Sequence, residues 1–564
     1  MPGFFITNTK KTPKLTNYIN FECVQGEMQY ENWTIKWNVL DKYMDDKIFF
    51  QNDEYLVILD GVILNKKSLI EKSNFSTWTD VVLELIKLDT EWFKKLRGVF
   101  AGAVLDKKNK SWIIFTDQCG AHLCLLYNQD GNVAFSSQLN YISDWMNLNN
   151  IKKIIDDDWK QDILTYGCMR DSYSVIKNVN RIYPGNYYKL SIETFKSSEF
   201  SYYVVKKQSK IKTEKQWIEE LDSVFHNSIK SMIEKDEEYG YTTLVDISGG
   251  LDSRMNAVVS SIEGHNLFGI TYAQTNSDDQ IISEQIANKL KIEYKFFPMD
   301  NGDCLKEIED LVFMNNGFNF YYGITGGKKV LESLKNKKLG IEIWGLLGDI
   351  YEGAMIEDFS KELNWNYPRF RSSNLINEIK NPSIMHKNAD NELLWFYIRG
   401  MIMGMNTGFI RQNYVEPITP YGIPEFMDCC FSIPENIRIN KHIYRKWLIK
   451  KYPNMSKIKY SGTGVRLYPG NLDRIVNLPY RIYKRVYIKL FGLKKEWSMN
   501  PIDYWYNNNV EFRNIISEYY NSNIHLIDID KKFKNDIEYM YKKGNTFEKL
   551  MSITAIAAVK LYIL

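Results

Sequence analysis

The segment TTLVDISGGLDSRMNAVVSSI, residues 242–262, is the most informative part of this sequence for the fold. It runs from a short apolar stretch through two glycines into a pattern with helical spacing. Gly249 and Gly250 permit a sharp turn that brings backbone N–H groups close to a ligand, and a helix N-terminus adds partial positive charge. Ser248 and Ser253 add hydroxyl groups. A bare glycine pair favours a simple structural turn, but the complete segment predicts a strand, an anion-binding turn and a helix.

A carboxylate stands inside this predicted anion site. Asp252 fits there if it holds Mg²⁺, because the metal then bridges the carboxylate to phosphate oxygens. A second segment, LGIEIWGLLGDIYEGAM (339–355), again runs from an apolar strand to a glycine turn and reaches Asp349. Ligand contacts in an open α/β sheet gather at the carboxyl ends of its parallel strands. We therefore expect Asp252 and Asp349 to share one magnesium ion.

The chain divides into two halves with different patterns. Short apolar runs such as LVILDGVIL (56–64) and GVFAGAVLD (98–106), separated by polar turns, predict a sheet-rich domain over the first 200 residues. The polar stretch KKQSKIKTEK (206–215) is the expected linker. After it, strands alternate with helical stretches, which predicts a parallel α/β sheet, and beyond about residue 390 the pattern is mostly helical. We assign residues 1–205 and 206–564 to two domains.

Composition and charge exclude several classes of protein. The 564 residues carry 72 Lys and Arg against 69 Asp and Glu, and a net charge of +3 argues against a nucleic-acid binder. Seven cysteines without a CxxC pair argue against a disulfide scaffold and favour a reducing compartment. No apolar run approaches 18 residues, and the start, MPGFFITNTKK, lacks the order of a signal peptide. We therefore expect a cytoplasmic protein without a membrane-spanning segment.

Several motifs resemble those of the asparagine synthetase family, which includes β-lactam synthetases and lasso-peptide macrolactam cyclases. SGGLDS (248–253) matches the ATP loop of that family, and of the wider ATP-pyrophosphatase superfamily, residue for residue. The other similar segments, in the family's order along nearly the whole chain, are DGVILN (60–65), LRGVFAGAVLD (96–106), IYPGNYYKL (182–190), SDDQIISEQIANKL (277–290), GLLGDIYEG (345–353) and IKYSGTGVRL (458–467).

This resemblance implies a two-domain fold of the α+β and α/β classes. The N-terminal domain would be a β-rich sandwich of the Ntn-hydrolase type, as in class II glutamine amidotransferases. The C-terminal domain would be an ATP-pyrophosphatase, or PP-loop, parallel α/β sheet with a helical extension. ATP and Mg²⁺ are the cofactors that the resemblance implies.

The resemblance also implies site residues. Asp252, Asp349 and one of Lys457 and Lys459 would be catalytic, and the spacing to Tyr460 slightly favours Lys457. The implied nucleotide contacts are Ile247, Ser248, Gly249, Gly250, Leu251, Asp252, Ser253, Tyr272, Trp344 and Gly345.

Three departures from the family's glutamine-hydrolysing members occur in the N-terminal half. Those members begin Met-Cys-Gly and use the freed cysteine as nucleophile, whereas this sequence begins Met1-Pro2-Gly3. Asp60 replaces the asparagine of the family's NGEIYN motif, and a carboxylate would repel a developing oxyanion. Residues 30–55 contain no convincing arginine motif for a glutamine carboxylate. We therefore expect a retained N-terminal domain without glutaminase activity.

A fourth departure concerns the acid–base group of the C-terminal half. Asparagine synthetases carry a glutamate three residues before the metal-binding aspartate of this segment, and Leu346 occupies that place here. β-Lactam and macrolactam formers also vary at this position, which favours a larger or internal amine over ammonia as the nucleophile. Tyr351, Glu352 and residues elsewhere stay open as the base.

The implied function is an ATP-dependent amide ligase that releases AMP and pyrophosphate. A substrate carboxylate attacks the α-phosphate of ATP, and an amine then displaces AMP from the acyl-adenylate. The substrates would be a small-molecule or peptide carboxylate and an amine, and the product a macrolactam, a lactam or an amide of a sugar acid or natural-product intermediate. The alternatives are a non-catalytic scaffold of the same fold and a PP-loop adenylating enzyme of another class. A homodimer or a partner from a biosynthetic pathway also stays open.

The stretch RIYKRVYIKLFGLKK (481–495) mixes apolar and cationic residues at helical spacing. We expect it to pack on the protein's own core with a charged outer face. A membrane surface or an acidic partner is the alternative.

Overall fold

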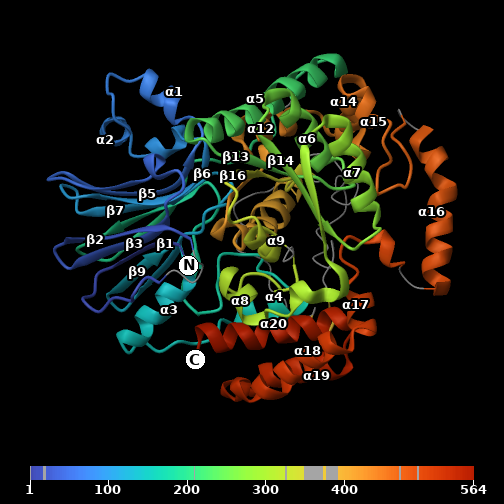
Figure 1. Ribbon diagram of the computed structural model, residues 1–564. Coiled ribbons are helices and arrows are strands. Elements are labelled where there is room, and N and C mark those ends of the chain that lie inside the picture. Colours follow the sequence, from blue (N-terminus) through green and yellow to red (C-terminus); the bar gives the residue numbers. More distant parts are fainter. Residues whose placement is uncertain are drawn as a thin grey trace.

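The computed structural model describes residues 2–16, 21–208, 210–323, 327–348, 372–375, 391–468, 472–491 and 494–564 (Figure 1). Two antiparallel sheets form from the first 201 residues, and a parallel sheet with helices follows. The sheet-rich half and the α/β half expected from the sequence are therefore confirmed. Beyond residue 390 the described chain is mostly helical, as predicted.

The N-terminal half is a sandwich of two six-stranded antiparallel sheets. Apolar and β-branched side chains of both sheets meet in one core, where the ring centroids of Trp33 and Trp112 are 5.5 Å apart. The first sheet contains, in spatial order, β10 (Val179–Arg181), β8 (Leu125–Gln129), β9 (Asn132–Ser136), β1 (Gly3–Thr7), β3 (Trp33–Leu40) and β2 (Cys23–Tyr30). The second contains β12 (Ser197–Ser201), β11 (Asn186–Ser191), β7 (Ser111–Thr116), β6 (Gly98–Asp106), β5 (Tyr55–Ile63) and β4 (Ile48–Gln51). The helices of this half are α1 (Lys66–Glu71), α2 (Trp78–Leu88), α3 (Leu139–Leu148) and α4 (Asp157–Thr165).

The second half is built on a five-stranded parallel sheet. Its strands, in spatial order, are β15 (Glu293–Pro298), β14 (Leu267–Ala273), β13 (Thr242–Asp246), β16 (Leu339–Ile343) and β17 (Glu416–Ile418). In β13, Leu244 belongs to the core on one face of the sheet and Val245 to the core on the other. Burial of both faces explains why the sequence of this strand is continuously apolar up to Asp246.

Helices cover both faces of the parallel sheet (Figure 1). Those of the α/β part are α5 (Glu214–Tyr239), α6 (Asp252–Glu263), α7 (Asp278–Leu290), α8 (Ile308–Met314) and α9 (Gly327–Ser333). The later helices are α11 (Asn391–Trp395), α12 (Pro424–Ser432), α13 (Glu435–Arg438), α14 (His442–Lys451), α15 (Pro453–Ser456), α16 (Leu472–Phe491), α17 (Ile502–Asn508), α18 (Val510–Asn523), α19 (Lys531–Lys543) and α20 (Thr546–Tyr562). A π-helix at Phe396–Gly404 and a short 3₁₀-helix at Arg411–Asn413 precede β17.

One apolar core joins the two halves. Phe5 and Trp145 of the N-terminal half belong to the same cluster of buried side chains as Leu550 and Ile556 of α20. Between the halves, α5 begins within the predicted linker, because Thr213 and its partner three residues later form a capping box.

Helix α16 does not pack as expected. Its apolar residues Ile482, Val486 and Phe491, which belong to the stretch 481–495, are 53%, 51% and 73% exposed. The expectation that this stretch packs its apolar side on the core is therefore wrong, and α16 stands at the edge of the molecule in Figure 1. None of the helices in the described part of the chain combines the length and apolar character that a membrane crossing requires.

Candidate functional site

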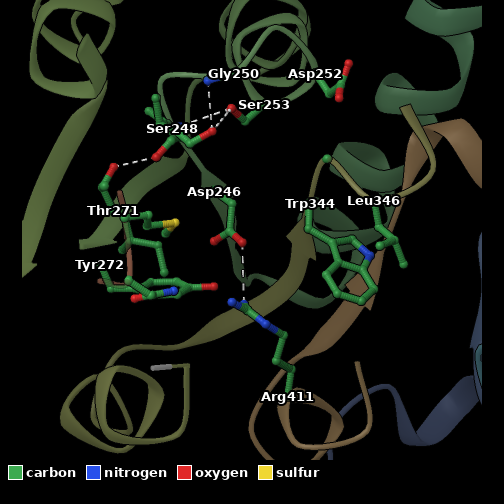
Figure 2. Close-up of a pocket in the computed structure, with 15 residues that line it drawn as sticks. Asp246, Ser248, Gly250, Asp252, Ser253, Thr271, Tyr272, Trp344, Leu346 and Arg411 are labelled. Carbon is green, nitrogen blue, oxygen red and sulfur yellow. Dashed lines mark hydrogen bonds and ion pairs between the residues drawn. The ribbon is translucent and has the colours of Figure 1, made fainter. Parts of the chain in front are cut away.

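A pocket of about 280 Å³ opens at the carboxyl ends of β13, β14 and β16 (Figure 2). The turn after β13 forms one side of the pocket, Tyr272 and Trp344 stand on opposite sides of it, and Arg411 lies at its floor. The described residues that line it are Asp246, Ile247, Ser248, Gly250, Asp252, Ser253, Ile270, Thr271, Tyr272, Trp344, Gly345, Leu346, Arg411, Met499 and Asn500.

Hydroxyl groups and backbone amides organise the turn after β13. Ser253 Oγ accepts a hydrogen bond from Ser248 N at 3.0 Å and lies 2.7 Å from Ser248 Oγ. Gly250 N donates to Ser248 Oγ at 3.2 Å, and Gly249 N donates to Asp279 Oδ1 at 2.9 Å. Helix α6 begins directly after this turn. A strand, a tight turn and a helix N-terminus in this order are suited to binding an anion.

Asp252 is the first residue of α6 and lines the pocket. Tyr421 Oη donates to the backbone carbonyl of Asp252 at 3.0 Å and lies 3.1 Å from Tyr444 Oη. A Cβ atom added to Gly348 would lie 2.4 Å from Asp252 Cγ, so the turn after β16 packs directly against this carboxylate. The predicted metal ligand Asp349 lies outside the described residues.

The oxygen donors at this end of the pocket fit Mg²⁺. Magnesium is commonly held by one or two carboxylates, with phosphate oxygens and water completing the octahedron. Asp252 supplies one carboxylate here. Within the described ranges, no group of three or more His, Cys, Asp and Glu side chains could hold a metal ion. Asp252 is thus one oxygen ligand for such an ion, and the predicted second ligand, Asp349, lies outside the described residues.

The loop that carries the two predicted lysines lies against the turn after β13. Ser461 N donates to Gly249 O at 3.1 Å. Lys459 Nζ is 2.7 Å from Asp278 Oδ1 at the start of α7, and Lys457 is exposed. Neither lysine is among the described residues that line the pocket. The choice between them stays a prediction.

Arg254 fixes the position of this loop. Its fully buried guanidinium, on α6, donates to the carbonyl oxygens of Met455, Ile458 and Lys459 at 3.1, 3.0 and 2.6 Å. Burial lowers the pKa of Arg254 to about 10, so the side chain keeps its charge at neutral pH. One arginine thus connects the helix that follows the turn to the loop that faces it.

The structure brings most of the predicted nucleotide contacts into one place. Eight of the ten line the pocket, namely Ile247, Ser248, Gly250, Asp252, Ser253, Tyr272, Trp344 and Gly345. The other two do not: Gly249 lies in the turn without lining the pocket, and Leu251 is buried in the adjoining core.

Several lining residues were not predicted. Asp246 carried a signal, because it is a charged residue at the end of an otherwise apolar strand. No sequence signal marked Arg411, Met499 and Asn500, because they come from segments far along the chain that only folding brings to the pocket. Thr271 lies one position before the predicted Tyr272.

A second, much smaller pocket of about 40 Å³ lies where Pro2 meets the other half of the chain. Lys47 Nζ is 3.2 Å from Asp60 Oδ1 in this pocket, and His122 Nε2 is 3.1 Å from Glu416 Oε2. Its described lining contains no cysteine. The volume leaves room for only a few water molecules, so it is too small for a glutamine substrate.

Comparison with known proteins gives two informative matches. Residues 41–203 match a family model described as a glutamine amidotransferase domain. A Methanocaldococcus jannaschii protein named "Putative asparagine synthetase (glutamine-hydrolyzing) 2" is 26% identical over 219 residues, which are 37% of this chain and 42% of that relative. The chain therefore spans about two fifths of the length of that curated relative.

Two solved structures align weakly. One bears the description "Structure of the allosteric regulatory enzyme of purine biosynthesis" and aligns at 11% identity with a TM-score of 0.23, over 52% of this chain and 74% of that one. The other, glutamine phosphoribosylpyrophosphate amidotransferase from B. subtilis complexed with ADP and GMP, aligns at 12% identity with a TM-score of 0.21, over 46% and 58%. At scores this low, the alignments carry no argument. Residues 41–203 are thus similar to a glutamine amidotransferase domain, and part of the chain is similar to a putative asparagine synthetase, which supports an asparagine synthetase-like family.

Proposed function

We propose that this protein is an ATP-dependent amide ligase that releases AMP and pyrophosphate without hydrolysing glutamine. The observation that carries the proposal is one pocket in which the SGGLDS turn, Asp252 and the predicted adenine contacts Tyr272 and Trp344 meet. Its position at the carboxyl ends of parallel strands is the usual ligand position in open α/β sheets. The name of the M. jannaschii relative supports the same reaction class.

The proposed reaction has two steps. A substrate carboxylate oxygen attacks the α-phosphorus of ATP, and the bond to the β-phosphate oxygen breaks, which gives an acyl-adenylate and pyrophosphate. An amine nitrogen then attacks the acyl carbon, and AMP leaves with the electrons of the broken C–O bond. Both steps develop negative charge on phosphate oxygens, which positioned donors can stabilise before the reaction begins.

The pocket residues have distinct roles in this proposal. The amides of the turn and of the α6 N-terminus bind the phosphates, and the ends of β13, β14 and β16 hold the adenosine. Lys457 or Lys459 supplies positive charge from the facing loop. When bound, Mg²⁺ supplies further positive charge to the phosphate oxygens, and Asp252 would hold it together with Asp349.

Independence from glutamine is supported by the surroundings of Pro2. Proline offers no thiol, and the pocket around it has no cysteine in its described lining. Asp60, which stands where the family carries an oxyanion donor, is instead 3.2 Å from Lys47. The matched amidotransferase span begins at residue 41 and does not include Pro2.

The direct test is to supply Mg-ATP, a panel of carboxylates and a panel of amines, and to separate the nucleotides by chromatography. We expect AMP and pyrophosphate in equal amounts, with no glutamate formed from added glutamine. Asp252→Asn should lower turnover at least about a hundredfold, since it removes the carboxylate that would hold Mg²⁺ against the phosphate oxygens. The matched control is Asp222→Asn, on α5, whose side chain is 17% exposed and pairs with Lys451 at 3.1 Å. Release of ADP and phosphate, or of glutamate, would contradict the proposal.

A further inference from the structure

Helix α16 is held to the rest of the protein along one side. A Cβ atom added to Gly464, in the loop after α15, would lie 2.4 Å from the ring of Tyr480, so these two residues are in close contact. Lys484 Nζ lies 5.3 Å from the centroid of the Trp497 ring, and the ring centroids of Tyr487 and Trp497 are 4.9 Å apart. Successive residues of an α-helix are rotated by about 100°, so Tyr480, Lys484 and Tyr487 lie on one side of α16.

The side of α16 that carries its apolar row faces solvent. We define the apolar row as Ile482, Val486 and Leu490, which follow one another at intervals of four residues. All three are exposed, Leu490 by 66%. Ile482 and Val486 each lie two positions from Lys484, a rotation of about 200°, so they point away from the side that contacts the protein. An amphipathic helix of a globular protein normally buries its apolar stripe, and this one does not.

A row of cations runs beside the apolar row. We define the cationic row as Arg481, Arg485 and Lys489, each of which precedes a member of the apolar row by one residue and is exposed. Residues 474–491 contain five Lys and Arg and no Asp or Glu, whereas the whole chain has a net charge of only +3. The remainder of the chain is therefore net negative, and the excess of positive charge belongs to this helix.

We propose that α16 binds the surface of an anionic lipid membrane and lies in the plane of that surface. The apolar row would enter the boundary between headgroups and acyl chains, and the cationic row would contact the lipid phosphates. The helix stands at the edge of the molecule in Figure 1, where a flat surface can reach it. This inference goes beyond the proposed ligase function and does not depend on it.

A bilayer suits α16 better than two other partners do. A second copy of the chain, docked helix to helix, would bring the two cationic rows together, and juxtaposed like charges are unfavourable. An acidic protein would match the charges, but it would also need an apolar groove alongside them. An anionic bilayer presents phosphate groups next to acyl chains along the whole length of the helix.

Membrane docking of α16 would also place the candidate site close to the lipid surface. Ser461, in the loop before α16, donates its backbone N–H to Gly249 of the turn after β13. Met499 and Asn500, which follow α16, line the pocket. Segments on both sides of the helix thus belong to the site or contact it.

Vesicle binding by the full chain tests this inference. We would measure co-sedimentation with phosphatidylcholine vesicles and with vesicles in which about a third of the lipid is phosphatidylglycerol. The apolar variant carries Ile482→Gln, Val486→Gln and Leu490→Gln, and the charge variant carries Arg481→Gln, Arg485→Gln and Lys489→Gln.

Helix α19 provides the matched control. It also has exposed lysines, but its apolar residues Phe533, Ile537 and Met540 are buried in the protein. The control variant carries Lys531→Gln, Lys542→Gln and Lys543→Gln, so it loses as many exposed cations as the charge variant does. The substituted side chains of all three variants are exposed, and thermal unfolding should confirm that each variant folds.

We expect the unaltered protein to bind the anionic vesicles at least about tenfold more tightly than the phosphatidylcholine vesicles. The apolar variant and the charge variant should each lose about tenfold or more in affinity for the anionic vesicles, because insertion and electrostatic attraction both contribute. The control variant should change by less than about twofold, since α19 has no apolar row to insert.

Several results would overturn the inference. The first is no binding of the unaltered protein to the anionic vesicles, or equal binding by it and the apolar variant. The second is an equal loss of affinity in the control variant, which would show attraction by net charge alone. The third is equal affinity for soluble polyglutamate and for the anionic vesicles, which would point to an acidic protein partner. The fourth is a dimer, seen by analytical ultracentrifugation, that the apolar variant no longer forms, because a second copy would then cover the helix.

Discussion

Gly249 lies at a tight contact between the turn after β13 and the loop that faces it. A Cβ atom at this residue would lie 2.6 Å from Ser461 Cβ and 2.9 Å from Ser461 Oγ. Gly249→Ala should therefore separate the two loops, and we expect the affinity for Mg-ATP to fall about tenfold or more while the fold persists. Isothermal titration calorimetry measures the change.

A second substitution makes this prediction specific. Ser461→Gly removes both of the atoms that an alanine at residue 249 would meet first. The double variant should regain most of the lost affinity, and Ser461→Gly alone provides the baseline. If the double variant binds as weakly as Gly249→Ala, steric contact between these loops is not the cause.

His122 links the stability of the molecule to pH. Burial lowers the pKa of His122, but the hydrogen bond and charge of Glu416, with its Nε2–Oε2 distance of 3.1 Å, raise it by more, so the net pKa is raised. The stabilisation is therefore fully present below the unfolded-state pKa of about 6.5 and is lost as the pH rises through the folded-state value. We expect His122→Gln to lower the free energy of unfolding by about 1–3 kcal/mol at pH 5 and by less at pH 9. Urea unfolding at both pH values measures the difference.

The control is His265→Gln, which alters an exposed histidine. A larger loss of unfolding free energy at pH 9 than at pH 5 for His122→Gln would contradict this assignment.

At the scale of elements, α6 and the loop after α15 are held together by Arg254. Three carbonyl oxygens, of Met455, Ile458 and Lys459, accept hydrogen bonds from its guanidinium. Lysine cannot reproduce this planar fork, so Arg254→Lys should free the loop. We expect tryptic cleavage after Lys457 and Lys459 to become about tenfold faster or more.

Limited proteolysis followed by mass spectrometry measures the rate of cleavage after Lys457 and Lys459. Arg438→Lys is the matched control, because it alters another buried guanidinium, which pairs with Glu392. Cleavage at the two lysines should not change in that control. Equal rates in the unaltered protein and in Arg254→Lys would show that the loop is held by other contacts.

The elements predicted from the sequence are those with strong local patterns. The run at 98–106 is a strand over that whole range, and the run at 56–64 overlaps β5 (Tyr55–Ile63). The polar edge strand β2 (Cys23–Tyr30) was missed, because its side chains are only partly buried and form no apolar run. The turn of the site was predictable because SGGLDS is contiguous. Arg411 was not, since only the folded chain brings it beneath Asp246.

At the scale of the whole molecule, the shared core couples the two halves. Ile556 of α20 is fully buried in the cluster that also contains Phe5 and Trp145. Ile556→Ala should lower the free energy of unfolding by about 2–5 kcal/mol, because it leaves a cavity in a buried helix. We expect one calorimetric transition that shifts as a unit, with hydrogen exchange rising in β1 as well as in α20.

The comparison variant for this prediction is Ile114→Val, in the separate core between the two N-terminal sheets. It should lower the same single transition by less, about 0.5–1.5 kcal/mol. Two separate transitions, with only one shifted by Ile556→Ala, would show that the halves unfold independently.

The exposed side of α16 has a consequence for the colloidal behaviour of the protein. Apolar side chains such as Ile475 and Phe491 stand in solvent on the same helix as the cations Arg481 and Arg485. At low ionic strength, like charges on two approaching molecules keep these apolar surfaces apart. Added salt screens that repulsion, because the Debye length falls to about 10 Å at 0.1 M salt. Salt does not weaken apolar attraction in the same way. The second virial coefficient of the protein should consequently change from positive to negative as salt is added. Concentrated solutions should then stay clear at low salt and become turbid at high salt.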